Sequence, residues 1–387
     1  MSVYTKIMNI SELLSLYEYR VKWPLKFKFY SMTRPVDKKT VLFSDPYSTD
    51  LTDNMVPIYT ALQTMGGFNL VKCFSEPITP APSLIGKIRG RISRGKVYDR
   101  FLKEYASAGT VFLTESFLSA YAVPRRDGTQ VVQLWHGSGA FKKWGYSTLD
   151  KEFGATRKSA DRFPMHNCYT LVPVSADVVV PCYAEAFACS QAIVQPLGVP
   201  RTDELARDPS STPHDKTTVL YAPTFRGNNV TSAHCDDILN IRHLHDALGD
   251  DYKILLRLHP FARNKIEIPD DCKDFCIDIS DMDTNSALRM ADILVTDYSS
   301  IIFEYSLLGK PIIFYAYDLD EYKNNRDFYF SYEDFVPGPI VTAEDDLISA
   351  ILNVDSSATQ VKSFADTYMS ACDGRATERI LTYLKLI

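Results

Sequence analysis

The amino-acid sequence predicts an α/β protein with two parallel-sheet domains that face each other across a cleft. Short apolar runs rich in β-branched residues alternate with amphipathic helical patterns, which is typical of parallel strands joined by crossover helices. This alternation occurs twice, on either side of a polar, proline-bearing stretch at 208–216. With 387 residues and 45% apolar content, the chain is also too long for one ordinary domain.

The same patterns divide the chain into a basic N-terminal segment, residues 1–40, and two domains, residues 41–207 and 216–387. We expect the basic segment to be either packed on the protein or close to a membrane. The strands that we expect in the first domain are 41–44, 68–74, 110–113, 131–135 and 169–174, with helices at 54–65 and 176–189. The strands that we expect in the second domain are 219–221, 253–258, 293–296 and 311–315.

The formal net charge of −6 hides two basic segments. Residues 1–40 carry eight Lys or Arg against three acids, and residues 84–105 carry seven against two. The second segment is amphipathic, so we expect it to lie on an anionic membrane surface, with an ordinary packed helix or a basic groove for an anionic substrate as alternatives. Nucleic acid is not an expected partner, because the rest of the chain is acidic and contains no nucleic-acid module.

The eight cysteines form no CxxC pair, and we expect free or buried thiols in a reducing compartment. The first ten residues have no secretory apolar core, and no apolar run is long enough to span a bilayer. The expected location is therefore cytoplasmic, peripheral at the inner face of the cell membrane. We expect no metal and no other cofactor, since the acid pairs at 281 and 283 and at 318 and 320 are more typical of solvated loops or helix caps.

A first candidate site follows the strand expected at 131–135. His136 comes directly after this strand, with Gly137 and Ser138 behind it and Lys142 and Lys143 shortly after. Glycines let the backbone approach a ligand, and a histidine at a strand end can take a proton from an alcohol near neutral pH. We therefore predict His136 as a catalytic base, although a histidine in this setting can also serve a purely structural hydrogen bond.

A second candidate site follows the strands of the second domain. Arg226, Arg257, His259, Ser299 and Ser300 all come shortly after a predicted strand. Because the carboxyl ends of parallel strands line one crevice, these side chains are expected to converge on an anion. Arginine offers forked donors that match phosphate oxygens, so the predicted ligand is a diphosphate.

The strand at 293–296 is expected to end at Thr296 and Asp297, which we include in this donor site. A helical pattern begins just after the serines, so backbone N–H groups would gather there around a phosphate. Glu304 lies one turn into that helix, where its carboxylate could accept hydrogen bonds from a ribose. The structural alternative is a well-capped helix after a buried strand.

Six motifs in this order resemble the CDP-glycerol glycerophosphotransferase family of teichoic-acid and capsule synthesis. They lie at 133–139 with 142–143, 221–226, 256–260, 296–300 with 304, 317–322 and 336–339. The resemblance runs from about residue 40 to the C-terminus. It implies a GT-B-type pair of Rossmann-like domains, with the acceptor in the first and the nucleotide donor in the second, and it implies that His136 and His259 are important for activity.

The resemblance further implies transfer of glycerol phosphate or ribitol phosphate from CDP-glycerol or CDP-ribitol to a hydroxyl of a lipid-linked or polymeric acceptor, with release of CMP. Gly137, Ser138, Lys142 and Lys143 are then expected to contact the acceptor. Two alternatives remain at this stage. One is a GT-B glycosyltransferase with a nucleotide-sugar donor, because fold alone does not separate the two reactions. The other is a non-catalytic, membrane-associated binding protein.

Overall fold

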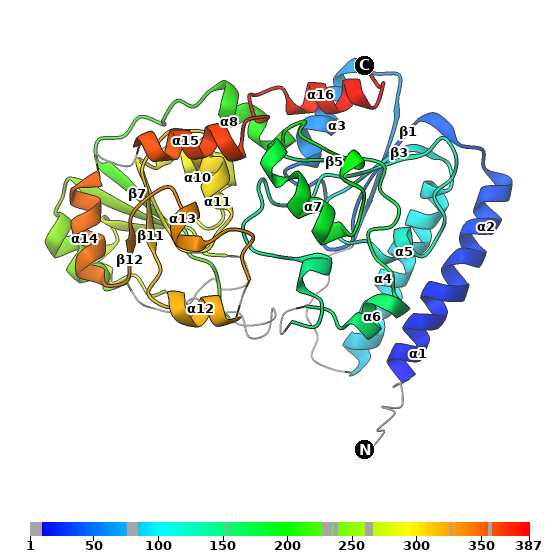
Figure 1. Ribbon diagram of the computed structural model, residues 1–387, viewed down its shortest axis with the longest axis horizontal. Coiled ribbons are helices and arrows are strands. Elements are labelled where there is room, and N and C mark those ends of the chain that lie inside the picture. The colour runs from blue at the N-terminus through cyan, green and yellow to red at the C-terminus, as the bar shows by residue number, and fades with distance from the viewer. Residues whose placement is uncertain are drawn as a thin grey trace.

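The computed structural model describes residues 10–75, 84–151, 154–226, 234, 239–259, 266–325, 327–354 and 358–387, without the side chains of 84–94 and 324–325. Figure 1 shows two α/β halves side by side, with most of the chain up to about residue 200 on the right and most of the later chain on the left. The expected α/β class with parallel sheets is confirmed.

The first half is built on a parallel sheet in the order β2-β1-β3-β4. Its strands are β1 (Asp37–Asp45), β2 (Asn69–Phe74), β3 (Ala108–Leu113) and β4 (Gln130–Gln133). A second, two-stranded sheet, β5 (Val172–Pro173) with β6 (Val194–Gln195), adjoins β4 through a bridge between Val132 and Leu171. The strand predicted at 169–174 is thus only two residues long. The helices of this half are α1 (Ile10–Tyr17), α2 (Trp23–Thr33), α3 (Met55–Met65), α4 (Leu84–Tyr105), α5 (Leu118–Tyr121), α6 (Arg157–Arg162), α7 (Val180–Phe187) and α8 (Asp203–Arg207).

The second half is built on a six-stranded parallel sheet in the order β12-β11-β10-β7-β8-β9. Its strands are β7 (Thr217–Tyr221), β8 (Tyr252–Leu256), β9 (Cys276–Asp278), β10 (Ile293–Thr296), β11 (Ile312–Tyr315) and β12 (Ile340–Val341). The four strands expected here are present. The helices are α9 (Ile241–Leu248), α10 (Thr284–Met290), α11 (Ile301–Ser306), α12 (Leu319–Asn325), α13 (Tyr332–Phe335), α14 (Glu344–Leu352), α15 (Ala358–Tyr368) and α16 (Ala376–Tyr383).

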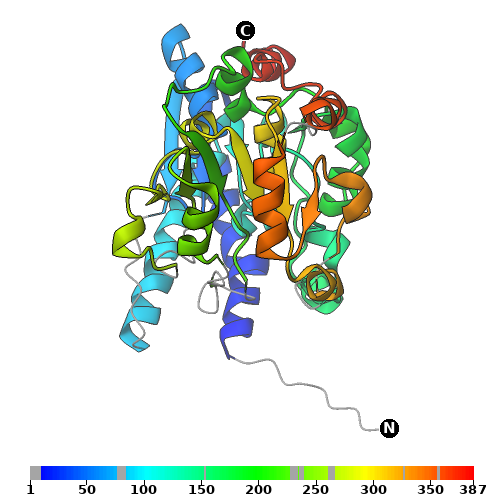
Figure 2. The same cartoon turned by 90° about the vertical axis from the view of Figure 1, so that its left-hand side faces the viewer.

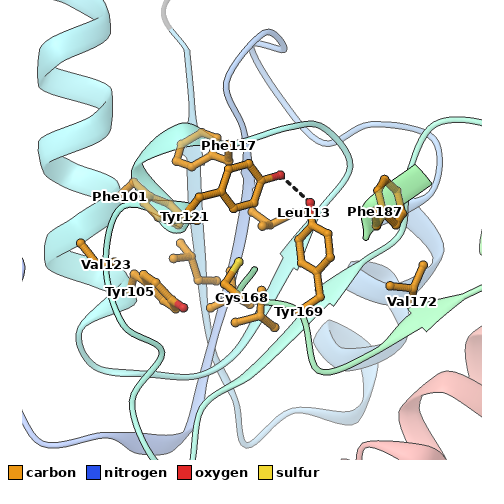
Figure 3. Close-up of a cluster of buried hydrophobic side chains, with 14 of the residues drawn as sticks. Phe101, Tyr105, Leu113, Phe117, Tyr121, Val123, Cys168, Tyr169, Val172 and Phe187 are labelled. Carbon is orange, nitrogen blue, oxygen red and sulfur yellow. Dashed lines mark hydrogen bonds between the residues drawn. The ribbon is translucent and has the colours of Figure 1, made fainter. Parts of the chain in front are cut away.

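Both large sheets carry apolar side chains on both faces, as parallel sheets do when helices cover them. In β1, Val41 and Phe43 pack with α3, while Leu42 belongs to the core on the opposite face. Figure 3 shows part of that opposite core, where Phe101 and Tyr105 of α4 lie near Phe117 and Tyr121. The second sheet is covered in the same way by α10, α11 and α15 on one face and by α9 and α14 on the other.

The last helix, α16, packs on the first half although our expected second domain ran to residue 387. Ile380, Leu381 and Leu384 lie in the same core as Val41 and α3. The carboxylate of Asp203 in α8 accepts hydrogen bonds from the first backbone N–H groups of α16, at 2.7 Å from Ala376 and 2.9 Å from Thr377. Figure 1 shows α16 above α3, so the chain returns to the first half at its end.

The N-terminal helices run along α4. α1, one π-helical turn (Glu18–Lys22) and α2 form a continuous rod that packs on α4 through Tyr19, Trp23 and Phe27. Figure 2 shows this rod and α4 side by side. The basic segment at 84–105 coincides with α4, a single helix. The last turns of α4 are packed in the core through side chains such as Phe101. None of the helices that the structure describes is both long and apolar enough to cross a membrane.

Candidate functional site at the carboxyl edges of the two sheets

A cavity of about 600 Å³ opens at the carboxyl edge of the first sheet. It is lined by the loop after β1, by Thr114 and Glu115 after β3, by Trp135 and His136 after β4, and by Arg201. The chain leaves β1 toward β2 on one side and later returns as β3 on the other, so this edge is the topological switch point of the sheet. Ligands of open α/β sheets bind at such points.

His136 lies at this cavity with an accessible imidazole. Its side chain is 55% exposed, and its Nδ1 lies 2.7 Å from Oε1 of Glu115. The ring stacks on Trp135 with 4.2 Å between centroids. Trp135 has a φ of 55°, a left-handed conformation that is costly for a bulky residue and is typical of functional sites. Asn54 stabilises this turn, because its Nδ2 donates to the Trp135 carbonyl at 2.9 Å.

The residues that follow His136 reach the second half. Ser138 is fully buried, and its hydroxyl donates to Oε1 of Glu304 at 2.5 Å. Gly139 lies against the ring of Phe303 so closely that a Cβ at this position would be 2.2 Å from Cε1. A Cβ at Gly137 would make only ordinary van der Waals contacts, the nearest at 3.8 Å, and the Gly137 carbonyl accepts a hydrogen bond from Tyr183 at 3.0 Å. Ser138 thus makes a hydrogen bond between the two halves of the chain and is not among the residues that line the cavity.

Lys142 and Lys143 pair with a segment of the second half. Lys142 forms a bridge with Phe328, and its Nζ lies 3.5 Å from the hydroxyl of Tyr322. The backbone N–H of Lys143 donates to the Asp327 carbonyl at 2.9 Å. The two predicted acceptor-binding lysines therefore lie where the halves meet.

Arg226 is the centre of an ion-pair cluster at the switch point of the second sheet. Its Nε and Nη2 donate to Asp318 at 2.7 and 2.9 Å, and its Nη1 donates to Asp297 at 2.8 Å and to the Thr224 carbonyl at 2.6 Å. Burial lowers the pKa of Arg226, whereas the neighbouring carboxylates of Asp297 and Asp318 raise it by a larger amount. The net pKa therefore lies above its ordinary value.

Our expectation that Arg226 binds a diphosphate stays a prediction, and the cluster leaves few of its donors for such a ligand. An arginine has five N–H donors, and four of those of Arg226 are already engaged with protein oxygens. Asp297 also accepts from the backbone N–H groups of Thr224 and Tyr298. Thr296 is likewise structural, because its buried hydroxyl donates to the Ala222 carbonyl at 2.7 Å. In this arrangement the three residues stabilise the edge of the sheet through hydrogen bonds to protein atoms.

The other predicted donor-site residues are partly exposed at the same edge. Ser299 and Ser300 follow β10, and Ser300 is the N-cap residue of α11. Arg257 follows β8, and its Nη2 donates to the hydroxyl of Thr284 at 2.8 Å. The ring of His259 lies 4.6 Å from that of Phe225. Pro260, the last residue of the motif at 256–260, lies outside the described residues.

Glu304, which we predicted to contact a ribose, is buried where the two halves meet. Its side chain is only 2% exposed, and it forms an ion pair with Arg201 in addition to the hydrogen bond from Ser138. Among the described residues, its Oε2 has no hydrogen-bond partner. Nη1 of Arg201 also donates to the backbone carbonyl of His136 at 2.9 Å. Arg201 therefore connects the two candidate sites, a role that no sequence pattern indicated.

Within the described parts of the chain, no group of three or more His, Cys, Asp or Glu side chains is arranged to hold a metal ion. Asp283 caps α10 by accepting from the Ser286 N–H at 3.0 Å, and Asp318 is paired with Arg226. Seven cysteines lie in the described ranges, all with free thiols. Cys235 lies outside them.

The chain matches a family of known proteins over most of its length. The model of the family described as CDP-Glycerol:Poly(glycerophosphate) glycerophosphotransferase matches residues 26–386. The chain is 34% identical, over 90% of its length, to a teichoic acid poly(ribitol-phosphate) polymerase of Bacillus spizizenii, and spans 56% of that protein. It is also 34% identical, over 92% of its length, to a teichoic acid ribitol-phosphate primase of the same organism, and spans 94% of it.

A solved structure of the wall teichoic acid polymerase TagF has the same fold. It superposes with a TM-score of 0.76 at 22% sequence identity, and 98% of each chain is covered. At this identity the match concerns the fold, which is an α/β fold with parallel sheets.

Proposed function

The chain belongs to the CDP-glycerol:poly(glycerophosphate) glycerophosphotransferase family, and on this basis we propose that it transfers a polyol phosphate from a CDP-activated donor to a hydroxyl group. The acceptor is a lipid-linked or polymeric chain in teichoic-acid or capsule-type synthesis, and CMP is the leaving product. The observation that carries the proposal is the exposed imidazole of His136, held by Glu115 at the switch point of the first sheet.

The proposed arrangement is of the GT-B type, with Rossmann-like domains at 41–207 and 216–387. The last helix of the second range, α16, packs on the first domain. Two parallel sheets, each with polar side chains at the carboxyl edge of its switch point, support this assignment. The first domain would bind the acceptor and the second the donor. Ser138, Lys142 and Lys143 would hold the two domains in contact through Glu304 and the segment 327–329.

In the proposed reaction, the imidazole of His136 accepts the proton of the acceptor hydroxyl as its oxygen attacks the polyol-bearing phosphorus. The new P–O bond forms while the bond from that phosphorus to the oxygen of CMP breaks, and CMP leaves with the electron pair. Arg257 and His259 would neutralise charge on the diphosphate, and Ser299 and Ser300 would contact its phosphate. Positioning and charge neutralisation supply most of the catalysis in phosphoryl transfer.

Glu304 would contact the ribose of the donor after a local rearrangement. Its unpartnered Oε2 supports this role, because a hydrogen bond from a ribose hydroxyl would stabilise this buried carboxylate oxygen. Arg226 and Asp297 are assigned a supporting role at the same edge, since their polar atoms are engaged with each other and with Asp318.

The protein is further proposed to act as a peripheral protein at the anionic inner face of the cell membrane. A stripe of exposed apolar side chains along α1, the π-helical turn and α2 supports this, on the side away from Tyr19, Trp23 and Phe27. The stripe consists of Ile10, Leu13, Leu14, Tyr17, Val21, Leu25, Phe29 and Met32. Such an amphipathic rod with basic neighbours is suited to a lipid interface.

Vesicle flotation tests this membrane proposal. Co-flotation is expected with vesicles that contain anionic lipid and not with purely zwitterionic ones. Replacing Leu25 and Phe29 by Glu should abolish it.

The decisive test of the reaction is a turnover assay with a mass readout. The purified protein is mixed with CDP-glycerol, CDP-ribitol or a UDP-sugar and a short lipid-linked acceptor. We expect release of CMP and an increase in acceptor mass by whole polyol phosphate units. Release of UDP with transfer of a sugar would establish the glycosyltransferase alternative. Absence of any product with all three donors would leave the binding-protein alternative.

A further inference from the structure

Resting on the proposed function, we propose that Glu115 is a positioning residue for His136. Its carboxylate accepts the Nδ1–H of the imidazole and thereby fixes the neutral tautomer in which Nε2 is free to accept a proton. The distance of 2.7 Å between His136 Nδ1 and Glu115 Oε1 places the imidazole and the carboxylate in ion-pair contact, which is the observation on which the proposal stands.

The sheet itself brings these two residues together. β3 and β4 are parallel neighbours, with Leu113 in register with Gln133. Glu115 lies two residues beyond the first of these positions and His136 three residues beyond the second, so both side chains leave the same edge of the sheet. The hydroxyl of Thr114 donates to Asp45 at 2.7 Å, which anchors the chain just before Glu115.

Gln133 holds the backbone on both sides of this pair. Its Oε1 accepts from the N–H of Trp135 at 3.0 Å, and its Nε2 donates to the carbonyl of Glu115 at 3.2 Å. The same Nε2 donates to the hydroxyl of Tyr169 at 2.7 Å. The amide of Gln133 is fully buried, and one oxygen and two N–H groups are satisfied by these three partners.

Below Gln133, a buried network extends into the core. The Tyr169 hydroxyl lies 2.5 Å from that of Tyr121, as Figure 3 shows, and 2.9 Å from Nδ1 of His166. Fully satisfied buried networks rigidify a core. This network is joined through the amide of Gln133 to the backbone of Glu115 and Trp135, so it helps to hold Glu115 and His136 in position.

The pair also has a chemical purpose that an ordinary surface ion pair lacks. A partly exposed ion pair contributes little to stability. In a base–carboxylate pair, however, the carboxylate holds the imidazole in the required tautomer and stabilises the imidazolium that forms when the proton arrives. Glu115 is 26% exposed and lines the cavity together with His136. Both effects therefore act on the imidazole at the place where the acceptor hydroxyl would bind.

The test compares Glu115→Gln with a matched control, Glu344→Gln. Glu344 lies 2.7 Å from Nδ1 of His243 on the outer surface of the second half, so it makes a histidine–carboxylate contact of the same length without the cavity. We expect Glu115→Gln to lower kcat roughly 10²-fold with little change in KM for the CDP donor, since a misplaced general base loses a contribution of this order. Glu344→Gln should leave turnover within twofold of wild type.

A second readout does not depend on activity. The ring-nitrogen NMR shifts of ¹⁵N-histidine-labelled protein, measured well above pH 6.5, report the tautomer of each neutral imidazole, and a His136→Ala sample assigns the signal. We expect the Nδ1–H tautomer for His136 in wild type and its partial loss in Glu115→Gln. An unchanged tautomer, or unchanged turnover in the variant, would overturn the proposal. The expected tautomer change in a protein that turns over no CDP donor would instead support the pair and refute the proposed function.

Discussion

The guanidinium of Arg201 forms an ion pair with the carboxylate of Glu304, and this pair joins the first half of the chain to α11 of the second. The same guanidinium donates to the backbone carbonyl of His136 at 2.9 Å. Asn285 of α10 in turn donates to the backbone carbonyl of Arg201 at 3.1 Å. The position of the proposed base is therefore coupled to the packing of the two halves.

A Glu304→Gln variant should be destabilised by about 3 kcal/mol, because removing one partner of a buried ion pair leaves the other charge uncompensated. Urea unfolding followed by circular dichroism measures the change. A double variant, Arg201→Met with Glu304→Met, should recover much of the loss, since apolar replacements of buried pairs are often tolerated. If Glu304→Gln raises KM for the donor while stability is unchanged, Glu304 binds the ribose only and does not hold the halves together.

A His136→Ala variant should retain binding of the CDP-polyol donor and lose turnover by roughly 10²–10⁴-fold, as expected for removal of a general base. Calorimetric titration with the donor measures binding, and CMP release measures turnover. His243→Ala is the matched control, because His243 also pairs with a glutamate but lies on α9 of the second half and does not line the cavity. Wild-type rates in His136→Ala would remove this residue from the mechanism.

The sequence located the strand ends well because buried β-branched runs determine them locally. β10 was expected at 293–296 and lies at Ile293–Thr296. The strand at 169–174 was overestimated, because Tyr169 contributes its hydroxyl to a buried network rather than its backbone to a sheet. The return of α16 to the first half depends on capping by Asp203, which is distant along the chain and has no local signal.

The partners of the site residues were harder to predict than their positions. Arg226 lies at the carboxyl end of a strand, as the sequence predicted. Its ion pairs with Asp297 and Asp318, however, depend on how three loops, which follow three different strands, come together in space. Arg201 was missed because it belongs to no periodic pattern. Glu115 could have been found by applying to the strand at 110–113 the same rule that found His136.

An Arg226→Met variant should be destabilised by about 3–5 kcal/mol, because it leaves the carboxylates of Asp297 and Asp318 buried together without a cation. Urea unfolding gives this value directly. Arg242→Met is the control: Arg242 pairs with Asp271 on an exposed surface, so its loss should have no measurable effect on stability. A stable Arg226→Met variant with a raised Kd for the CDP donor would instead show that Arg226 binds the diphosphate.

The two glycines on either side of Ser138 should respond differently to alanine. In Gly139→Ala the new Cβ would overlap the buried ring of Phe303, which we expect to cost about 1–3 kcal/mol, as overpacking of a core typically does. In Gly137→Ala the nearest atom is 3.8 Å away, so the change should stay within about 0.5 kcal/mol. Equal stability of the two variants, measured by urea unfolding, would show that the halves pack less closely here.

Acid should destabilise the protein through His166. Burial lowers the pKa of this imidazole to about 3, whereas an unfolded chain has a value of about 6.5. Between these values the unfolded state binds a proton that the folded state does not, so stability is fully present above pH 6.5 and falls by about 1.4 kcal/mol per pH unit below it.

Comparing the slopes of stability against pH in wild type and His166→Asn isolates this contribution from that of the carboxylates. Asn is suitable because His166 has a φ of 61°, which asparagine tolerates. The slope between pH 6 and pH 4 should be about 1.4 kcal/mol per unit smaller in the variant. Equal slopes would mean that His166 is protonated in the folded protein. The Tyr169 hydroxyl could then no longer donate to its Nδ1, and the network beneath Gln133 would have a different proton arrangement.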